Sequence, residues 1–495
     1  MISKYLRDGN EYSQEELCNI LECKTQEVKS IIHRLIDFKV LKLDTVSASK
    51  KEFSALIEDK VDAEYEGSVT NSSHYTLNFV GIIVVANRVL KCYPKYILNQ
   101  SEPKEHLRIV LKVLEKYKEE LKEKKHHNKS KEQHLHMFSD FKDNSSFNSL
   151  AVIIFLLSDY YTNGTYSNSM ERIECNGEGE ILWDKTINDS IPVFFNKSCY
   201  YLNLKTRKKT NDNNDYFKRL HECILSSIST QLKNADLLEL FNAVEINLSD
   251  ESLQDFGDEN TILYRIENEL NRQFNSRKQL VLKALYSYIK NHGSIQEIDA
   301  FSLFGTTKFE HVWQAVCNIM MRNQYDMPLK KIKLPLSLNK EYNPNDLLKD
   351  VIEKPFWSAA KQRAKNSFNL DLISIVDEKF IISDAKYYVP VLCPNEPLAG
   401  QPGIEDVAKQ YLYQLAFKKF IKQHGLKFSG NFFLMPTEAF DFIYKGTASL
   451  NMLSNLGLDE IHIIFVPADK AYDYYLSGKP LDIQQFLGIP QQSLS

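Results

Sequence analysis

Residues 369–388 read NLDLISIVDEKFIISDAKYY, and this stretch decides how the last third of the chain folds. It contains two apolar segments, residues 370–376 and 379–386, separated by an Asp-Glu dipeptide. Apolar, β-branched runs on either side of a two-residue polar turn predict an antiparallel hairpin. In the register that this turn sets, Asp371 faces Asp384 across the two strands.

The polar end of this hairpin carries an unfavourable pair of charges. Directly opposed residues hold their Cβ atoms about 4.5–5.5 Å apart, where like charges are destabilising, and burial adds a desolvation penalty. The repulsion is relieved if one carboxyl keeps its proton or if a divalent cation binds between Asp371 and Asp384. Lys386 is two residues after Asp384 and therefore emerges on the same face, while Ala385 points away.

This arrangement predicts a site for phosphodiester hydrolysis. Mg²⁺ prefers oxygen ligands and is commonly held by one or two carboxylates together with substrate phosphate, and Mn²⁺ is the expected substitute. Lys386 would orient and activate the attacking water. The alternative is a solvated hairpin end, in which Lys386 is an ordinary salt-bridge partner of the two aspartates.

The bulk composition is that of a globular protein. The chain has 495 residues, enough for about two to four domains, and its net charge of −4 neither favours nor excludes nucleic acid. Its eight cysteines form no CxxC pattern, which favours reduced side chains over a zinc site. The first residues lack the apolar core of a signal sequence, and the longest apolar run, residues 150–157, is too short to cross a bilayer. We therefore expect a cytoplasmic protein that does not enter a membrane.

Residues 1–66 predict a winged helix-turn-helix. Ser13 and Glu16 have the spacing of a capping box before the first helix, Thr25 is the expected cap of the second helix, and a short strand follows. Three outward-facing cations of the second helix are the candidate DNA contacts: Lys29, His33 and Arg34. In one interpretation this helix lies on DNA. In the other, which the sequence supports equally, the module contacts protein or is structural.

Residues 67–292 predict an α+β middle domain. Residues 75–98 have the pattern of a β-hairpin with Asn87 near its turn, and residues 103–125 that of a helix with one apolar face. A basic stretch near residues 122–136 is expected to be a solvated linker, because its histidines lack the spacing of metal ligands on a helix.

Residues 293–495 form the predicted C-terminal α/β domain, because further apolar strands and a helix follow the hairpin. Two basic stretches, residues 321–335 and 354–368, precede the hairpin and are the candidate track for DNA phosphates, with a solvated surface as the alternative. Their cations are Arg322, Lys330, Lys331, Lys333, Lys361, Arg363 and Lys365. The last three, nearest the hairpin, are the predicted DNA contacts.

The hairpin pattern resembles the signature of the PD-(D/E)XK nuclease superfamily, although Leu370 stands where that motif has proline. Residues 371–388, followed by GIEDVAKQYLYQLAF, resemble more specifically the LlaJI-type restriction endonucleases, which are similar to McrC nuclease subunits. Further blocks that resemble the family lie at residues 79–97, 177–188, 216–221 and 304–317. The resemblance covers nearly the whole chain apart from the predicted winged helix, and it implies a multidomain α/β protein with a C-terminal nuclease domain.

The resemblance implies roles for five side chains. Asp371 and Asp384 would be metal ligands, and Lys386 would position the attacking water and stabilise charge on the phosphate. Glu310, on a helix before the hairpin, would be a further metal ligand, or else is a solvated helix carboxylate. Gln410, on the helix after the hairpin, would lie near the scissile phosphate, or else is an ordinary polar helix residue.

The resemblance also implies double-stranded DNA as substrate and a McrB-like AAA+ NTPase subunit as partner. The chain contains no G-x-x-x-x-G-K-[ST] motif, so no NTP site is predicted in it. Cleavage of two strands implies a homodimer or a larger assembly. Tyr387 and Tyr388 either border DNA or fill a core. The competing interpretation is a non-enzymatic winged-helix DNA-binding regulator, which leaves the opposed aspartates unexplained.

Overall fold

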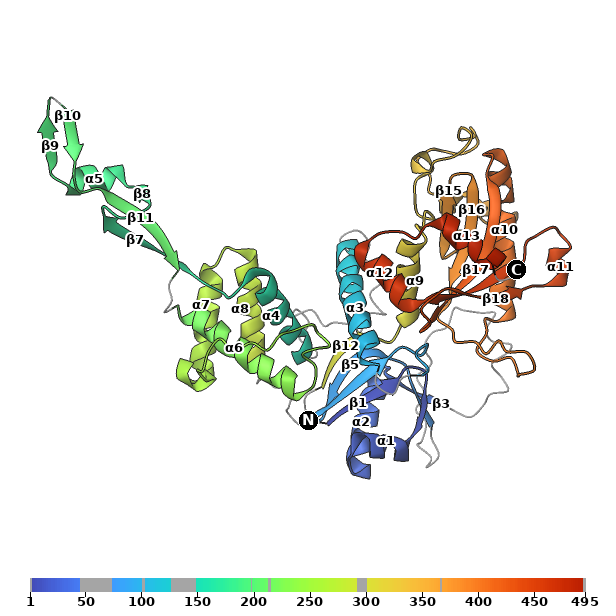
Figure 1. Ribbon diagram of the computed structural model, residues 1–495, viewed down its shortest axis with the longest axis horizontal. Helices are drawn as coiled ribbons and strands as arrows, with labels where there is room; N and C mark the ends of the chain where they lie inside the picture. The colour runs from blue at the N-terminus through green and yellow to red at the C-terminus, as the bar shows by residue number, and fades with distance from the viewer. Residues whose placement is uncertain are drawn as a thin grey trace. The chain divides into compact units, whose positions relative to one another are not determined.

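The computed structural model describes residues 2–44, 74–99, 103–125, 148–196, 198–211, 215–291, 301–365 and 367–492 (Figure 1). The chain divides into two compact units. One takes residues 139–302 with residues 84–87, and the other takes residues 2–83, 88–138 and 303–495. The predicted middle domain, residues 67–292, therefore contributes to both units, and its two predicted boundaries lie outside the described residues.

The N-terminal elements form a small α+β module. They are β1 (Ile2–Arg7), β2 (Glu11–Ser13), α1 (Gln14–Leu21), α2 (Thr25–Asp37), β3 (Leu41–Asp44) and β4 (His74–Leu77). Strand β4 pairs with both β2 and β3. The predicted capping box is confirmed, because the Glu16 amide donates to Ser13 Oγ and the Ser13 amide donates to Glu16 Oε2. The cap predicted for the second helix is wrong: α2 begins at Thr25 itself, and Lys24 precedes it without a side-chain cap.

A four-stranded sheet with the order β1-β6-β5-β12 joins the first strand of the chain to strands that come later in the sequence. Its further strands are β5 (Val80–Val85), β6 (Arg88–Tyr93) and β12 (Phe301–Thr306). The predicted hairpin is confirmed, with Ala86 and Asn87 at its turn in the left-handed region (φ 46° and 60°), as a two-residue hairpin turn requires. Gly81 lets β12 approach, because a Cβ there would lie 2.1 Å from the carbonyl oxygen of Phe304.

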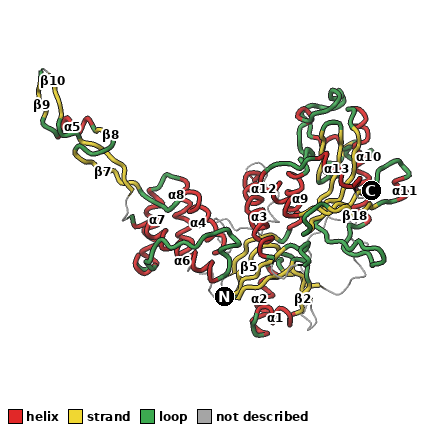
Figure 2. The backbone as a smooth tube through the Cα atoms, viewed as in Figure 1, coloured by secondary structure: helices red, strands yellow, loops and turns green. Residues whose placement is uncertain are grey.

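Two groups of elements make up the unit of residues 139–302. The helices are α4 (Ser149–Asn163), α6 (Tyr216–Asn234), α7 (Glu259–Arg272) and α8 (Ser276–Lys290). An ion pair between Arg277 Nη2 and the buried Asp159 Oδ2 (2.7 Å) joins α8 to α4. The second group, which we call the arm, consists of β7 (Ser169–Cys175), β8 (Glu180–Ile181), α5 (Trp183–Asp189), β9 (Pro192–Phe195), β10 (Ser198–Tyr201) and β11 (Lys205–Asn211) (Figure 2). In the arm β11 pairs with β7 and β8, and β9 and β10 form a separate hairpin.

The last third of the chain forms a five-stranded sheet with the order β15-β16-β17-β19-β18. Its strands are β15 (Leu372–Val376), β16 (Lys379–Ala385), β17 (Lys427–Thr437), β18 (Ile443–Ala448) and β19 (Ile461–Pro467). Val376 pairs with Lys379 and Leu372 pairs with Ser383, so the predicted hairpin and its register are confirmed. The three central strands β16, β17 and β19 are parallel, and the two edge strands are antiparallel to them.

Helices cover both faces of this sheet. They are α9 (Phe309–Met320), α10 (Ile404–Gln423), α11 (Asn451–Ser454), α12 (Ala468–Ser477) and α13 (Ile483–Gln492). On one face Phe380 packs against Phe417 of α10, with ring centroids 5.3 Å apart. Ile375 pairs with Phe380 and shares its face of the sheet. Side chains alternate along a strand, so the neighbouring Ser374 points to the other face. There its hydroxyl donates to the carbonyl oxygen of Met321 at the end of α9 (2.5 Å). The predicted multidomain α/β architecture is confirmed at this level.

One long helix and several short elements complete the described part of the chain. They are α3 (Lys104–Lys125), η2 (Leu253–Phe256), η3 (Leu329–Lys331), η4 (Leu348–Val351), β13 (Phe356–Trp357) and β14 (Gln362–Arg363). Helix α3 confirms the predicted helix of residues 103–125, and the four histidines of the predicted linker lie outside the described residues. None of the helices described here combines the length and the apolar character needed to span a membrane.

Candidate active site

Two carboxyl groups meet at the end of the β15–β16 hairpin. Asp384 lies in β16, and Asp371 immediately precedes β15. Their side chains hydrogen-bond to each other, and Asp371 Oδ2 also accepts from the Ala385 amide at 3.2 Å. The hairpin register therefore brings together the two aspartates that the sequence predicts as a pair.

The pKa of Asp371 is raised from its ordinary value of 3.8 to about 8. Burial is the largest cause, followed by the hydrogen bond and the negative charge of Asp384, while Lys386 and the Ala385 amide act in the opposite direction. Two anionic carboxylates in contact are unfavourable in a poorly solvated site, so the pair retains a proton or takes a cation. Adjacent, hard oxygen ligands of this kind suit Mg²⁺ or Mn²⁺.

Lys386 lies beside the pair and bridges two elements. Its Nζ is 3.1 Å from Asp384 Oδ2 and 2.7 Å from Asp406 Oδ1, and these three side chains are only 18%, 11% and 14% exposed. Burial acts to lower the pKa of Lys386, but the charges and hydrogen bonds of Asp384 and Asp406 outweigh it and raise the pKa above its ordinary value. Lys386 is therefore a fixed ammonium group.

Asp406 is a site residue that the sequence analysis missed. It lies in the first turn of α10, where an acidic side chain also complements the helix dipole. A signal was present, because Asp406 is four residues before Gln410 and so shares its helix face. What the sequence does not state is that the start of α10 comes within hydrogen-bond reach of Lys386.

Gln314 is a second missed residue. It lies on α9, and its Nε2 donates to Asp371 Oδ1 at 2.7 Å. Asn323, just after α9, donates through Nδ2 to the backbone carbonyl of Asp371 (2.9 Å) and accepts from the Ile373 amide (3.0 Å). These contacts fix the start of β15 and orient the Asp371 carboxyl group from the α9 side.

Glu310, the predicted further metal ligand, is not brought to the pair. Its side chain is 46% exposed and lies 3.7 Å from Lys308 Nζ. In the part of the chain that the structure describes, no group of three or more His, Cys, Asp and Glu residues is placed to hold a metal ion. The prediction identified the correct helix but the wrong turn of it. Gln314, four residues after Glu310 on α9, is the side chain that contacts Asp371.

A model of the LlaJI restriction endonuclease family matches residues 79–469. The chain belongs to this family. It is therefore a nuclease of a restriction system. A similar curated protein is the component YdjA of the type II restriction enzyme BsuMI from Bacillus subtilis (strain 168), which is 27% identical over 421 residues, covering 84% of this chain and 83% of the relative.

Two solved structures from Thermococcus gammatolerans are also similar to this chain of the LlaJI family. One is a half-complex from a tetradecameric assembly of McrB AAA+ hexamers with bound McrC, at 11% identity and a TM-score of 0.36, covering 96% of this chain and 99% of that chain. The other is the McrBC complex, at 14% identity and a TM-score of 0.21, covering 58% and 79%.

In this LlaJI-family chain Gln410 lies on α10, one turn after Asp406, and is buried. Its Oε1 has no hydrogen-bond partner among the residues that the structure describes. Gln414, a further turn along, is engaged elsewhere, because its side chain bonds to Asp459 through both the backbone amide (3.2 Å) and the carboxylate (3.4 Å). Of the two glutamines, Gln410 is the one with an acceptor left for a water or a ligand.

Tyr387 fills a core and does not border a surface. Its hydroxyl donates to Asp8 Oδ2 (2.9 Å) and accepts from the Lys95 amide (2.9 Å), and its ring lies 5.1 Å from that of Phe309. Burial, the largest cause, raises the pKa of Asp8. Of the two alternatives for Tyr387, the structure supports the core.

The predicted DNA contacts lie on the surface of their elements. Lys29 and His33 are exposed one turn apart on α2, and Arg34 is half-buried. Lys361, Arg363 and Lys365 are exposed in and after the β13–β14 hairpin. Their role in binding DNA stays a prediction.

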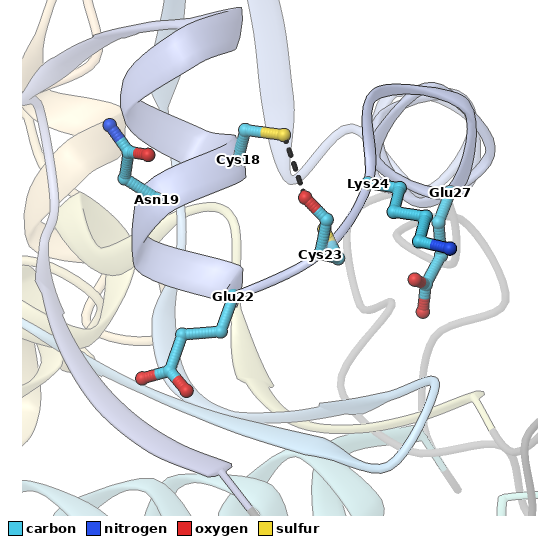
Figure 3. Close-up of a pocket in the computed structure, with 6 residues that line it drawn as sticks. All are labelled: Cys18, Asn19, Glu22, Cys23, Lys24 and Glu27. Atoms are coloured by element: carbon cyan, nitrogen blue, oxygen red, sulfur yellow. Dashed lines mark hydrogen bonds between the residues drawn. The ribbon is translucent and has the colours of Figure 1, made fainter.

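A hollow of about 640 Å³ lies at the turn between α1 and α2 (Figure 3). The residues that line it are Cys18, Asn19, Glu22, Cys23, Lys24 and Glu27. Cys18 Sγ donates to the Cys23 carbonyl oxygen at 2.8 Å and so closes the turn. None of the carboxylate-site residues lines this hollow, and it is a feature of the N-terminal module alone.

Replacing Asp371 by asparagine should stabilise the metal-free protein at high pH. Because the pKa of Asp371 in the folded protein lies above 3.8, the folded state binds this proton more tightly than the unfolded chain, and stability falls as the pH rises from about 4 towards the raised pKa. The Asp371→Asn variant lacks this titration. In a chelator we expect its Tm to exceed that of the wild type at about pH 8 and the difference to shrink towards about pH 5. Each tenfold difference in proton affinity between the folded and unfolded states changes the free energy of unfolding by about 1.4 kcal/mol.

Thermal unfolding followed by circular dichroism measures this effect. Asp377→Asn, on the exposed turn of the same hairpin, is the matched control and should leave the pH dependence unchanged. Adding MgCl₂ should favour the wild type over Asp371→Asn, because only the wild type keeps both carboxylate ligands. A Tm difference that does not vary with pH would contradict the assignment.

Proposed function

We propose that this chain is a Mg²⁺-dependent endodeoxyribonuclease, the nuclease subunit of a restriction system that defends against phage and acts on double-stranded DNA. The observation that carries the proposal is the contact between Asp371 and Asp384 with Lys386 beside them. The hairpin, the following helix α10 and the parallel strands support a PD-(D/E)XK fold for residues 293–495. The pair of helices with β2, β3 and β4 supports a winged helix for the N-terminal module.

Asp371 and Asp384 would hold the metal ion, with Mn²⁺ as a substitute for Mg²⁺. Their contact in a buried site supports this assignment, because the repulsion between them disappears when a divalent cation binds. When bound, the cation supplies positive charge at the scissile phosphate and makes a nearby water more acidic. Gln314 keeps the Asp371 carboxyl in place for this role through its hydrogen bond of 2.7 Å.

Lys386 would orient the attacking water and stabilise the charge that develops on the phosphate. Its raised pKa keeps it cationic, and its three ammonium protons exceed the two carboxylate contacts that the structure gives it. Asp406 is the positioning residue, since it holds Lys386 from α10 at 2.7 Å. Gln410 lies one turn later, and its Oε1 has no partner among the described residues. It would bind close to the scissile phosphate through an intervening water.

An AAA+ NTPase subunit is the proposed partner. The sequence contains no G-x-x-x-x-G-K-[ST] motif, and the curated relative carries the name of an enzyme component. The tip of the arm supports a protein contact, because Phe194 and Phe195 on β9 are 73% and 66% exposed and Ile191 beside them is also exposed. Exposed apolar patches of this kind mark protein interaction sites.

Asp384→Asn and Lys386→Ala should abolish DNA cutting while the protein stays folded. Loss of a metal ligand or of the charge beside the phosphate is expected to lower the rate by about 10²-fold or more. The measurement is cleavage of phage and plasmid DNA with Mg²⁺, with and without the product of the adjacent gene and ATP or GTP. Lys379→Ala, at the half-buried start of β16, is the control. Cutting that survives both site substitutions would refute the site, and DNA binding without cutting by the wild type would favour a regulator.

Asp406→Asn should weaken cutting less severely and change its pH profile. Removing a partner that positions an active group typically costs about 10–100-fold. Because Asp406 helps to raise the pKa of Lys386, its loss lowers that pKa, and activity should fall away at a lower pH than in the wild type. Asp406→Glu should recover part of the rate. An unchanged rate and profile would show that Lys386 does not depend on Asp406.

Replacing both Phe194 and Phe195 by serine should weaken binding to the proposed NTPase subunit. Both side chains are exposed, so the fold should be unaffected. We expect at least a tenfold loss of affinity for the purified subunit, measured by analytical ultracentrifugation with nucleotide, because truncating aromatic anchors costs about 2 kcal/mol or more. Phe274→Ser, at a highly exposed phenylalanine outside the arm, is the matched control. Equal losses in both variants would argue against the arm.

A further inference from the structure

The hairpin of β13 and β14 displays two large aromatic side chains that the fold does not use. Phe356 is 59% exposed and Trp357 is 66% exposed. Successive residues of a strand point to opposite faces, so the exposure of both rings means that neither face of this ribbon packs on the domain. Burying such rings is among the most favourable contributions to a core. Their exposure on a free ribbon indicates a contact outside the chain.

Strand pairing and hydrogen bonds nevertheless connect the two strands of the ribbon. Phe356 pairs with Arg363 across the two strands. Arg363 Nη1 donates to the carbonyl oxygen of Lys354 (3.0 Å), and the Ala364 amide donates to that of Pro355 (2.7 Å). A preorganised ribbon presents its aromatic rings with little further loss of conformational entropy on binding.

The charges around the ribbon indicate what it binds. Residues 354–368 contain four cations and no carboxylate. Glu353, directly before them, pairs with Arg363 Nη1 at 3.3 Å, so the three lysines are the cations without this partner. The cations, all exposed, are Lys354, Lys361, Arg363 and Lys365. Cationic side chains bind phosphates and aromatic faces stack on bases, and the combination is typical of nucleic-acid contacts. An apolar protein partner would explain the rings but not the cations on the same short segment.

The ribbon leads directly into the carboxylate site. Phe368 lies 6.1 Å from the ring of Tyr413, centroid to centroid, and the Tyr413 hydroxyl donates to the Asn369 carbonyl oxygen (2.8 Å). Tyr413 is on α10, on the same side of the sheet as Asp384. Arg363, which pairs with Phe356, precedes Asp371 by eight residues, a span of at most about 28 Å, which corresponds to about eight base-pair steps.

We propose that the β13–β14 ribbon is a DNA wedge, whose Phe356 and Trp357 stack on bases near the phosphate held at Asp371 and Asp384, while its three lysines bind the flanking phosphates. The proposal rests on the proposed nuclease function and deepens it by naming the element that grips the substrate. Insertion of aromatic side chains unstacks a base step, so a duplex with a flexible or unpaired step should bind best.

Tryptophan fluorescence of the full-length protein tests the wedge directly. The chain has three tryptophans, and stacking on a base quenches the one involved. In a chelator, a short DNA duplex should quench the wild type and the Trp183→Phe variant, whose replaced side chain is an exposed tryptophan of the arm. The Trp357→Phe variant should lose this quenching.

A binding series then tests the energetic role. Phe356→Ala combined with Trp357→Ala should weaken binding about tenfold or more and abolish the preference for a duplex with one unpaired base, with an unchanged salt dependence. Lys361→Ala combined with Lys365→Ala should instead reduce the salt dependence of binding while the preference remains. All four side chains are exposed, and thermal unfolding checks that the variants stay folded.

The outcomes separate the wedge from the nuclease assignment. Quenching that persists in Trp357→Phe, an absence of quenching in the wild type, or wild-type binding by the double aromatic variant would each overturn the wedge. So would normal DNA binding together with lost association with the NTPase subunit, because the ribbon would then be a protein contact. A wild type that shows Trp357 quenching but never cuts DNA would uphold the wedge and overturn the nuclease assignment.

Discussion

The contact between Asp371 and Asp384 is the constraint on which the rest of the site depends. Two carboxyl groups are held together by strand pairing, in a place where burial disfavours their charge. The cost is tolerable only because β16 is an inner strand of the sheet, with neighbours on both sides that prevent it from shifting. The remaining polar side chains are arranged around this fixed, unfavourable pair.

Three separate elements converge on the pair, and each constrains a different atom. Helix α9 orients Asp371 through Gln314, and the strand itself carries Lys386 beside Asp384. The first turn of α10 supplies Asp406, which pairs with the Lys386 ammonium group at 2.7 Å. Each buried charge therefore has a partner of opposite sign or a hydrogen-bond donor, as a buried polar cluster requires. The geometry suits a site that binds a cation and keeps a second, permanent positive charge next to it.

Much of this was predictable from local sequence, and the limits are equally instructive. The register of the hairpin follows from a two-residue turn and strand alternation, which act over a few residues, so Asp371, Asp384 and Lys386 were found together. Glu310 was chosen because the family resemblance implies an acidic residue on this helix. The side chain that faces Asp371 depends on how α9 is rotated against the sheet, and tertiary packing sets that rotation. That rotation places Gln314, one turn later, on the aspartate.

Asp406 was missed for a related reason. Helix periodicity indicates which residues share a face of α10, and Gln410 was selected on that face, but the depth at which a helix docks decides which turn meets the lysine. That depth is set by packing such as Phe380 against Phe417, which no local pattern specifies. For Tyr387 the sequence favoured a core but left contact with DNA open, because its burial depends on strands far away in sequence.

The environment of Tyr387 has a consequence for modularity. The residue that directly follows Lys386 is anchored by Asp8, after the first strand, and by the backbone of Lys95, after the sixth. The strand that presents the lysine is thus fastened at its far end to a sheet assembled from the start of the chain. A recombination event that transplanted only residues 293–495 into another protein would leave this tyrosine hydroxyl without either partner. The C-terminal α/β region therefore depends on the N-terminal sheet to satisfy the hydrogen bonds of this buried hydroxyl.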